Sequence, residues 1–230
     1  MEISKRVEII KNWIYDYVQS MPTKAKTLIV GVSGGIDSAV VSTISCMTGI
    51  QTVVLSMPIR QIKNQDDLSK LHCNWLVKKF KNAKFININL DKVFDAFEKA
   101  LDENKNEHAF ANSRARLRMT TLYQVAGSNH GIVVGTGNKI EDFGVGFFTK
   151  YGDGGVDISP IADCTKSQVW EMGKFLGIDQ KIIDAAPTDG LWADGRTDQS
   201  QLGGLSYQEL EEAMINPNSK YYQKYLEIRK

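Results

Sequence analysis

Short apolar runs rich in β-branched residues recur along the chain and are separated by stretches with helical spacing. The first run, residues 28–32, reads Leu-Ile-Val-Gly-Val, which is typical of a strand buried on both faces of a sheet. Three similar runs follow it. The predicted strands are Leu28–Val32, Thr52–Met57, Phe85–Leu90 and Ile132–Gly135.

The stretches between these runs repeat apolar side chains every three to four residues, as amphipathic helices do. One precedes the first strand, with apolar positions at Ile3, Val7, Ile10, Ile14 and Tyr17. The others are Ser38–Met47, Asp66–Lys79, Asp91–Leu101 and Arg114–Ala126. The order βαβαβααβ predicts an α/β fold with a doubly wound, mostly parallel, Rossmann-like sheet. Ligands of such sheets bind beyond the carboxyl ends of the strands.

Composition and length fit an intracellular enzyme with one domain. A chain of 230 residues with 42% hydrophobic side chains can form one large α/β core, with no room for a second catalytic domain. We therefore expect a single domain over residues 1–230, with small helices after about residue 187 and no glutaminase domain. A formal net charge of +1 provides no field that would attract nucleic acid.

The cysteines and the N-terminal residues indicate the cellular compartment of the protein. The three cysteines are odd in number and far apart in the sequence, which indicates reduced thiols. Charged residues stand near the N-terminus where a signal peptide would be apolar, and no run of about 18 apolar residues occurs. We expect a cytoplasmic protein that does not associate with a membrane.

The turn after the first strand carries the most informative chemistry. Ser33, Gly34 and Gly35 offer backbone N–H groups at the positive end of the following helix, which favours an anion of pyrophosphate size. The turn is not a Walker A loop, because no lysine follows Gly35, and its glycine spacing does not fit the dinucleotide fingerprint. Asp37 follows instead, and a carboxylate beside phosphate is favourable when a divalent cation lies between them. Asp37 is therefore the candidate magnesium ligand.

The run Ser-Gly-Gly-Ile-Asp-Ser at residues 33–38 resembles the loop of ATP pyrophosphatases. These enzymes split ATP into AMP and pyrophosphate while they adenylate a carbonyl or carboxylate oxygen. The alternative interpretation is an ordinary strand-to-helix turn in which Asp37 only caps the helix.

A second block, Gly-Phe-Phe-Thr-Lys-Tyr-Gly-Asp-Gly-Gly at residues 146–155, resembles the NAD synthetase family when it is taken together with the loop. Residues 112–119 and 206–210 also match that family's pattern. The resemblance implies an ATP pyrophosphatase fold, magnesium, a homodimer and an ATP-dependent amidation of deamido-NAD to NAD through an NAD-adenylate. Ammonia is the expected nitrogen donor, because glutamine-using members carry a separate amidohydrolase domain.

The resemblance also assigns roles to individual residues. It implies that Asp37 and Glu141 hold magnesium and that Arg116, Lys150 and Asp157 contact deamido-NAD. Asp37, Lys150 and Lys166 are the expected catalytic residues. The expected ATP contacts are Gly31, Val32, Ser33, Gly34, Gly35, Ile36, Asp37, Ser38, Thr136, Lys166 and Thr188.

Several of these residues also have simpler interpretations. Arg114, Arg116 and Arg118 fit a solvated helix surface, and only the resemblance favours a functional role, for Arg116 alone. Glu141 fits a loop charge. Lys166 fits the first turn of a helix capped by Asp163 or Thr165, which is compatible with phosphate binding.

Two competing classes share the loop. One is another ATP-pyrophosphatase ligase, either like GMP synthetase or tRNA-modifying. The block at 146–155 argues against the first, and the absence of a catalytic cysteine pair argues against the second. The other class is a non-catalytic nucleotide sensor, which does not need Glu141, Lys150 or Lys166. Many ammonia-dependent relatives also have a His-Lys pair in a C-terminal tail, and this contact cannot be assigned in a chain that stops at Lys230.

Overall fold

Four parallel strands form one sheet with the order β3-β2-β1-β4. The computed structural model describes residues 1–188, 190–192 and 196–229. The strands are β1 Thr27–Gly31, β2 Gln51–Ser56, β3 Ala83–Asn87 and β4 Gly131–Val133. The predicted α/β fold with a parallel sheet is confirmed, because every strand pairing is parallel.

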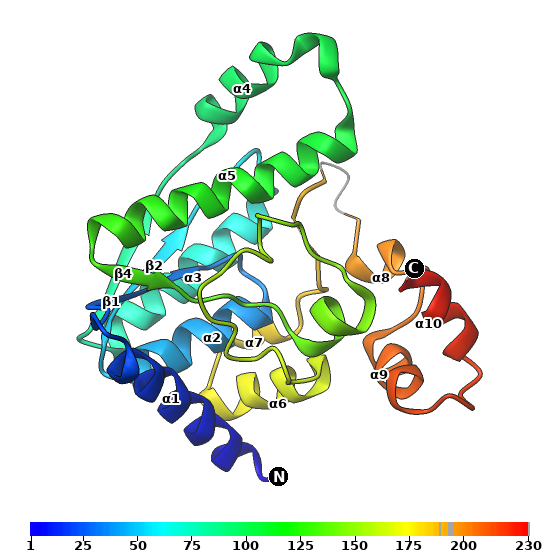
Figure 1. Ribbon diagram of the computed structural model, residues 1–230, viewed down its shortest axis with the longest axis horizontal. Coiled ribbons are helices and arrows are strands. Elements are labelled where there is room, and N and C mark those ends of the chain that lie inside the picture. Colours follow the sequence, from blue (N-terminus) through cyan, green and yellow to red (C-terminus); the bar gives the residue numbers. More distant parts are fainter. Residues whose placement is uncertain (189, 193–195, 230) are drawn as a thin grey trace.

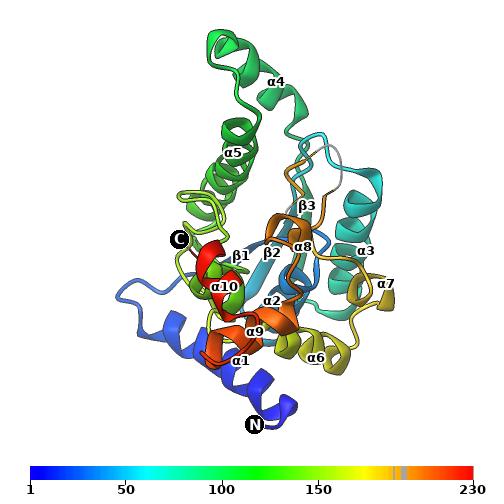
Figure 2. The same cartoon turned by 90° about the vertical axis from the view of Figure 1, so that its right-hand side faces the viewer.

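Helices cover both faces of this sheet, as Figure 1 shows. One face carries α1 Ile3–Ser20, α2 Ile36–Met47, α3 Lys63–Lys79, α6 Lys166–Leu176 and α7 Gln180–Ile183. The other carries α5 Glu107–Ser128, together with α4 Asp91–Ala100, which stands out above α5 in Figures 1 and 2. A short 3-10 turn, η1 Asp102–Asn104, joins α4 to α5. The sheet is therefore the middle of three layers.

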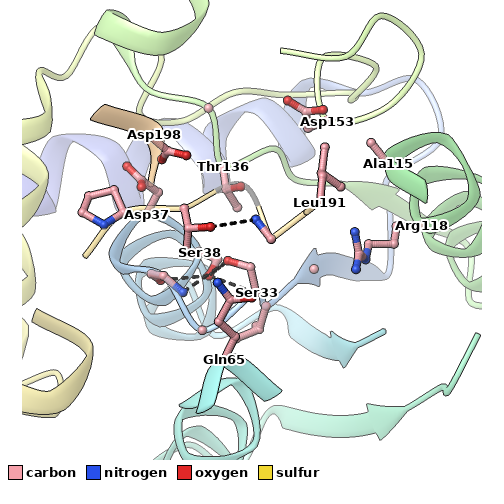
Figure 3. Close-up of a pocket in the computed structure, with 18 of the residues that line it drawn as sticks. Ser33, Asp37, Ser38, Gln65, Ala115, Arg118, Thr136, Asp153, Leu191 and Asp198 are labelled. Atoms are coloured by element: carbon pink, nitrogen blue, oxygen red, sulfur yellow. Dashed lines mark hydrogen bonds between the residues drawn. The ribbon is translucent and has the colours of Figure 1, made fainter. Parts of the chain in front are cut away.

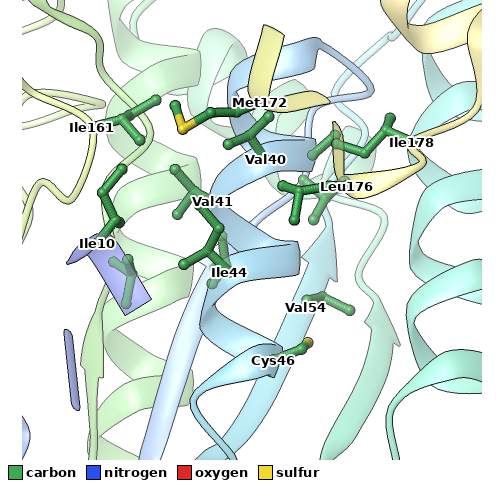
Figure 4. Close-up of a cluster of buried hydrophobic side chains, with 14 of the residues drawn as sticks. Ile10, Val40, Val41, Ile44, Cys46, Val54, Ile161, Met172, Leu176 and Ile178 are labelled. Atoms are coloured by element: carbon green, nitrogen blue, oxygen red, sulfur yellow. The ribbon is translucent and has the colours of Figure 1, made fainter. Parts of the chain in front are cut away.

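The two faces of β1 explain why its sequence is apolar throughout. Leu28 and Val30 face the cluster formed with α1, α2 and α6, whereas Ile29 between them faces the cluster formed with α5. All three side chains are fully buried, which stabilises the fold by roughly 1.5–3 kcal/mol for each. Figure 4 shows the first cluster, in which Val40 and Val41 of α2 pack among side chains of α1 and α6.

The order of the strands creates a crevice between β1 and β4. The chain leaves β1 toward α2 on one face of the sheet and reaches β4 from α5 on the other face. The crossover after β1 leads to β2 on one side of it, whereas the crossover into β4 on its other side runs over the opposite face, and doubly wound sheets bind ligands at such a reversal of strand order. The loop at 32–35 and the segment at 134–138 both lie at this point.

Capping and turn residues explain the largest differences from the predicted boundaries. Helix α5 begins at Glu107 instead of Arg114, because the Asn106 side chain accepts a hydrogen bond from the Ala109 N–H at 2.9 Å. Strand β3 ends three residues before the predicted Leu90. There the Asn89 side chain accepts the Asp91 N–H at 2.9 Å and turns the chain into α4.

The C-terminal helices form a small apolar cluster of their own beside the sheet. They are α8 Asp198–Gln201, α9 Tyr207–Ile215 and α10 Tyr222–Ile228. Tyr207, Leu210 and Tyr225 pack there against Ile140 and Val145. The last two residues belong to a π-helical segment, η2 Ile140–Val145, so the C-terminal helices rest on the segment that follows β4. Within the described ranges, no helix is long and apolar enough to cross a membrane.

A buried histidine joins α3 to α2 behind the phosphate loop. His72 Nε2 lies 3.0 Å from Ser42 Oγ and 3.1 Å from the Ala39 carbonyl oxygen. Burial lowers the pKa of His72 to about 4. The imidazole is therefore neutral at pH 7, and its contribution to the fold depends on staying so.

This histidine predicts how stability changes with acid. Because the pKa of His72 is lower in the folded state than in the unfolded chain, the contribution is fully present above pH 6.5 and is lost as the pH falls toward 4. The loss amounts to roughly 1.4 kcal/mol for each pH unit within that window. Urea unfolding of the wild type and of His72→Gln at pH 7, 6 and 5 measures it. The free energy of unfolding of the wild type is expected to fall toward that of the variant as the pH decreases. A difference between the two proteins that stays constant from pH 7 to pH 5 would contradict this.

Candidate active site

A cavity of about 720 Å³ opens at the crevice between β1 and β4 (Figure 3). All of the residues predicted to contact ATP or magnesium line it. They are Gly31, Val32, Ser33, Gly34, Gly35, Ile36, Asp37, Ser38, Thr136, Glu141, Lys166 and Thr188. The fold thus brings together five separate parts of the chain that the sequence pattern had linked only through resemblance.

The phosphate loop is held in shape by its own serines. Ser38 Oγ donates to the Gly35 carbonyl oxygen at 3.0 Å and accepts the Ser33 N–H at 3.2 Å, while Ser33 Oγ accepts the Gly35 N–H at 3.2 Å. Gly34 has φ +95°, and a Cβ atom there would lie 2.6 Å from the Gln65 carbonyl oxygen. The loop therefore needs glycine at position 34 both for its backbone conformation and for its close approach to α3.

One buried cation and two half-buried acids meet at one wall of the cavity. Lys166 Nζ lies 2.5 Å from Asp37 Oδ2 and 2.9 Å from Glu141 Oε1, and its side chain is 3% exposed. Asp37 stands in the first turn of α2, and Lys166 is the first residue of α6, where Thr165 and Gln168 form a capping box. Of the two predicted caps, Thr165 is the one that the structure shows.

Each charge changes the proton affinity of the other two. Burial alone would lower the pKa of Lys166, but the two carboxylates outweigh burial and raise this pKa above its ordinary value. Burial raises the pKa of Asp37 against the opposing effect of Lys166. Burial alone would also raise the pKa of Glu141, but Lys166 and the hydroxyl of Tyr207 hold it below its ordinary value. Lys166 is therefore a permanent cation between two acids.

Two residues to which the sequence patterns assigned no role fix these acids in place. Asn138 is fully buried and donates to Asp37 Oδ1 at 3.0 Å, while its own oxygen accepts the N–H groups of Ile140 and Glu141. Tyr207 of α9 donates to Glu141 Oε1 at 2.6 Å. Burial raises the pKa of Tyr207 above its ordinary value, so the hydroxyl keeps its proton. Neither role shows in the sequence, because each partner is far away along the chain.

The donor set suits a divalent cation that binds together with a nucleotide. Besides Asp37 and Glu141, the acids Asp66, Asp142, Asp153 and Asp198 line the cavity, and Lys166 is the one lysine among its described lining residues. Burial and the nearby Glu141 raise the pKa of Asp142 to about 7. The described residues contain no group of three or more His, Cys, Asp or Glu side chains that could hold a metal ion. Magnesium usually takes one or two carboxylates and completes its shell with water and phosphate oxygens, and Asp37 and Glu141 are the two carboxylates that could hold it.

The opposite end of the cavity is formed by α5 and the segment after β2. Arg118 donates from Nε to the Met57 carbonyl oxygen at 3.1 Å and from Nη2 to Gln61 Oε1 at 2.7 Å. Figure 3 shows Arg118 at the end of the cavity away from Asp37. The sequence comparison had favoured Arg116 alone, so the cavity-facing arginine was missed. Only the rotation of α5 about its axis decides which arginine faces the cavity.

Arg116, Lys150 and Asp157 do not line this cavity. Arg116 Nε donates to the Lys150 carbonyl oxygen at 3.0 Å, and Asp157 accepts from the Tyr123 hydroxyl at 3.1 Å and from the Val133 N–H at 2.7 Å. None of the three lines the shallow groove beside α5 either, but Tyr123, which donates to Asp157, and Tyr151, which follows Lys150, both line that groove. Its lining includes Met119, Thr120, Tyr123, Gln124, Tyr151 and Gly155. The structure therefore separates the predicted ATP contacts from the predicted deamido-NAD contacts.

The segment at 146–155 connects the two places. Its residues 146–149 and 153 line the cavity, whereas Tyr151 and Gly155 line the groove. It is fastened to α5 by Thr149, whose hydroxyl donates to Asn112 Oδ1 at 2.7 Å. A Cβ atom at Gly152 would lie 2.9 Å from Ala115 Cβ, so the segment packs closely against the helix.

A parallel doubly wound sheet with a glycine loop, an acidic site and a lysine at its switch point defines a nucleotide-binding α/β protein. The sequence model of the NAD synthase family matches residues 6–227. The chain therefore belongs to the NAD synthase family.

Individual relatives agree with this assignment. The chain is 41% identical over 214 residues to an NH(3)-dependent NAD(+) synthetase of Alkaliphilus metalliredigens. The alignment covers 88% of this chain and 83% of the relative. The chain is 37% identical over 217 residues to the enzyme of the same name from Carboxydothermus hydrogenoformans, covering 92% and 85%. Among solved structures, an NMN synthetase from Francisella tularensis is 32% identical with a TM-score of 0.90, covering 100% of this chain and 93% of that chain.

The phosphate loop yields a prediction with a matched control. Gly34→Ala is expected to destabilise the protein by roughly 1–3 kcal/mol, because a positive φ is unfavourable for alanine and the new Cβ meets backbone. Gly35→Ala, at φ −86° with Ser33 Oγ 3.4 Å from the new Cβ, is expected to cost less than about 1 kcal/mol. Urea unfolding of both variants measures the difference, and equal losses would contradict the structural distinction.

Proposed function

We propose that this protein amidates deamido-NAD to NAD with ATP and ammonia and releases AMP and pyrophosphate. The observation that carries the proposal is the Lys166 ammonium between Asp37 and Glu141 beside a phosphate loop, in a chain of the NAD synthase family. The curated relatives are named NH(3)-dependent, which supports ammonia as the donor.

The chemistry follows from the weakness of a carboxylate as an electrophile. Ammonia does not displace an oxide from a carboxylate at neutral pH, so the oxygen must first become a good leaving group. Transfer of AMP from ATP to the nicotinate carboxylate makes an NAD-adenylate, and ammonia then displaces AMP. The residues at the site serve this reaction by positioning two anionic substrates and by stabilising the departing pyrophosphate. No protein nucleophile is required.

The site residues take distinct parts in this scheme. Backbone N–H groups of the loop and the N-terminus of α2 attract phosphate, and Lys166 adds a charge at the N-terminus of α6. Asp37 and Glu141 would hold magnesium, which neutralises charge on the departing pyrophosphate. Thr136 and Thr188 line the same cavity and are proposed ATP contacts.

The second substrate is proposed to bind at the groove on α5. Arg116 and Lys150 supply positive charge there, and Asp157 lies beside them through its bond to Tyr123. Because the segment at 146–155 lines both the groove and the cavity, deamido-NAD bound at the groove could present its carboxylate to ATP. A homodimer and a cytoplasmic location remain predictions. The second is supported by three free, buried cysteines.

The name of the Francisella tularensis structure raises a second candidate product. That protein is an NMN synthetase, and its backbone is similar to this one over the whole of this chain. The substrate of this protein could then be the deamidated mononucleotide instead of deamido-NAD. Both reactions use the same adenylation site, so only the preferred substrate differs between the two candidates.

A direct assay tests the proposed function. The protein is incubated with ATP, magnesium, ammonium and either deamido-NAD or nicotinic acid mononucleotide, and all products are separated by chromatography. Equal amounts of NAD, AMP and pyrophosphate are expected with deamido-NAD, and a higher kcat/KM with the mononucleotide would establish the second candidate. Asp37→Asn is the matched control and is expected to lose roughly a hundredfold or more in rate. Turnover with neither substrate would contradict the proposal.

Two neighbouring arginines separate the two binding sites. Arg116→Ala is expected to raise KM for deamido-NAD about tenfold with little change in KM for ATP, because it removes a charge at the groove. Arg118→Ala is expected to raise KM for ATP with little change in KM for deamido-NAD, because Arg118 faces the cavity. Steady-state kinetics with each substrate varied in turn distinguish the variants. If both changed the same KM, the assignment of two sites would be wrong.

A further inference from the structure

Tyr207 reaches the charged centre from outside the sheet. It is the first residue of α9, its side chain is almost fully buried, and its hydroxyl donates to Glu141 Oε1 at 2.6 Å. The same hydroxyl lies 3.2 Å from Asp198 Oδ2. A phenol has one proton, and the shorter distance assigns it to Glu141. A residue of the C-terminal helices thus completes the surroundings of an acid that follows β4.

The position of this ring is fixed from several sides. Ser206, immediately before it, forms a capping box with Glu209 at the start of α9. Trp170 of α6 packs edge-on against the ring, with centroids 5.9 Å apart and planes at 90°. Lys166 Nζ lies 4.7 Å from the ring centroid, within the range of a cation–π interaction. Because the ring is already fixed before a ligand binds, its hydroxyl stays in one place and binding costs no further side-chain entropy.

The two partners of Glu141 differ in what they must do when substrates bind. Both Lys166 and Tyr207 bond to the same oxygen, Oε1. When ATP enters, the Lys166 ammonium is drawn toward phosphate, and a buried carboxylate that loses its only partner would reorient or take up a proton. The hydroxyl of Tyr207 cannot follow the phosphate, because α9 and Trp170 hold the ring. It is the partner of Glu141 that remains.

We propose that Tyr207 is a positioning residue, which keeps Glu141 oriented toward the divalent cation after Lys166 has turned to the phosphates of ATP. The C-terminal helices thereby become part of the cation site, although they lie beside the sheet (Figure 1). The inference rests on the proposed role of Glu141 as a cation ligand. It goes beyond that role, because it makes the affinity for the cation depend on a hydroxyl that does not touch it.

The test removes the hydroxyl and leaves the ring. Tyr207→Phe is compared with Tyr225→Phe, a buried tyrosine of α10 whose hydroxyl lies 3.3 Å from Arg229 Nη1. Binding of Mn²⁺ in the presence of a non-hydrolysable ATP analogue is followed by electron paramagnetic resonance. Tyr207→Phe is expected to weaken Mn²⁺ binding about tenfold to a hundredfold, as for loss of a hydrogen bond to a charged group. Tyr225→Phe is expected to leave it unchanged.

Steady-state kinetics provide a second readout that a purely structural role would not change. The Mg²⁺ concentration for half-maximal rate is expected to rise in Tyr207→Phe, whereas kcat at saturating Mg²⁺ falls much less. Tyr207→His keeps an N–H donor on a smaller ring and is expected to fall between the wild type and Tyr207→Phe. Unchanged Mn²⁺ binding in a folded Tyr207→Phe, or equal weakening in Tyr225→Phe, would overturn the proposal.

A double-mutant cycle with Glu141→Gln separates this inference from the proposed function. If Tyr207 acts through Glu141, its substitution weakens Mn²⁺ binding in the wild type but adds almost nothing to Glu141→Gln. If Glu141→Gln alone left Mn²⁺ binding unchanged, the proposed role of Glu141 would be wrong. If Glu141→Gln weakened it and Tyr207→Phe did not, only the inference about Tyr207 would be wrong.

Discussion

Charge neutralisation around Lys166 is the constraint on which the rest of the site depends. An ammonium that is 3% exposed is stable only with opposite charge in contact, and Asp37 and Glu141 supply it from two different parts of the chain. Each carboxylate in turn needs the lysine. Loss of Lys166 would leave two carboxylates without a counter-ion, so α2, η2 and α6 are held together by electrostatics as well as by apolar contacts.

The sheet topology places these charges where a phosphate can use them. Because the strand order reverses between the neighbours β1 and β4, the N-terminus of α2, which follows β1, opens toward the crevice. Helix α6 packs beside α2 and directs its own N-terminus to the same point. Two positive helix ends and one lysine thus lie at a cavity whose described lining also carries six carboxyl groups. A triphosphate with its cation complements both sets, whereas either ion alone complements only one.

The separation of the cavity from the groove on α5 bears on how two large substrates meet. Both surfaces use α5, and the glycine-rich segment at 146–155 lies against that helix and lines each of them. Its close packing at Gly152 and the bond from Thr149 to Asn112 fix the segment relative to the helix. The cavity and the groove are therefore held in a fixed relation by one helix and the segment packed on it.

Local features of this protein follow from short stretches of its sequence. The apolar run of β1, the glycine loop after it and the acid at position 37 are encoded within a dozen residues, because a strand buried on both faces and a turn with positive φ restrict the residues that fit. The resemblance to the family added Glu141 and Lys166 to the predicted site residues. Boundaries were less accurate, since a single cap such as Asn106 moved the start of a helix by seven residues.

The distant side chains that complete the site are brought to it by the packing of the whole fold. Asn138 reaches Asp37 across 101 positions of sequence, and Tyr207 reaches Glu141 across 66. Arg118 instead of Arg116 faces the cavity because of the rotation of α5 against the sheet, which follows from its packing. Local patterns record the backbone preferences of neighbouring residues. Contacts between distant residues arise only when the whole core packs, so no short stretch of the chain encodes them.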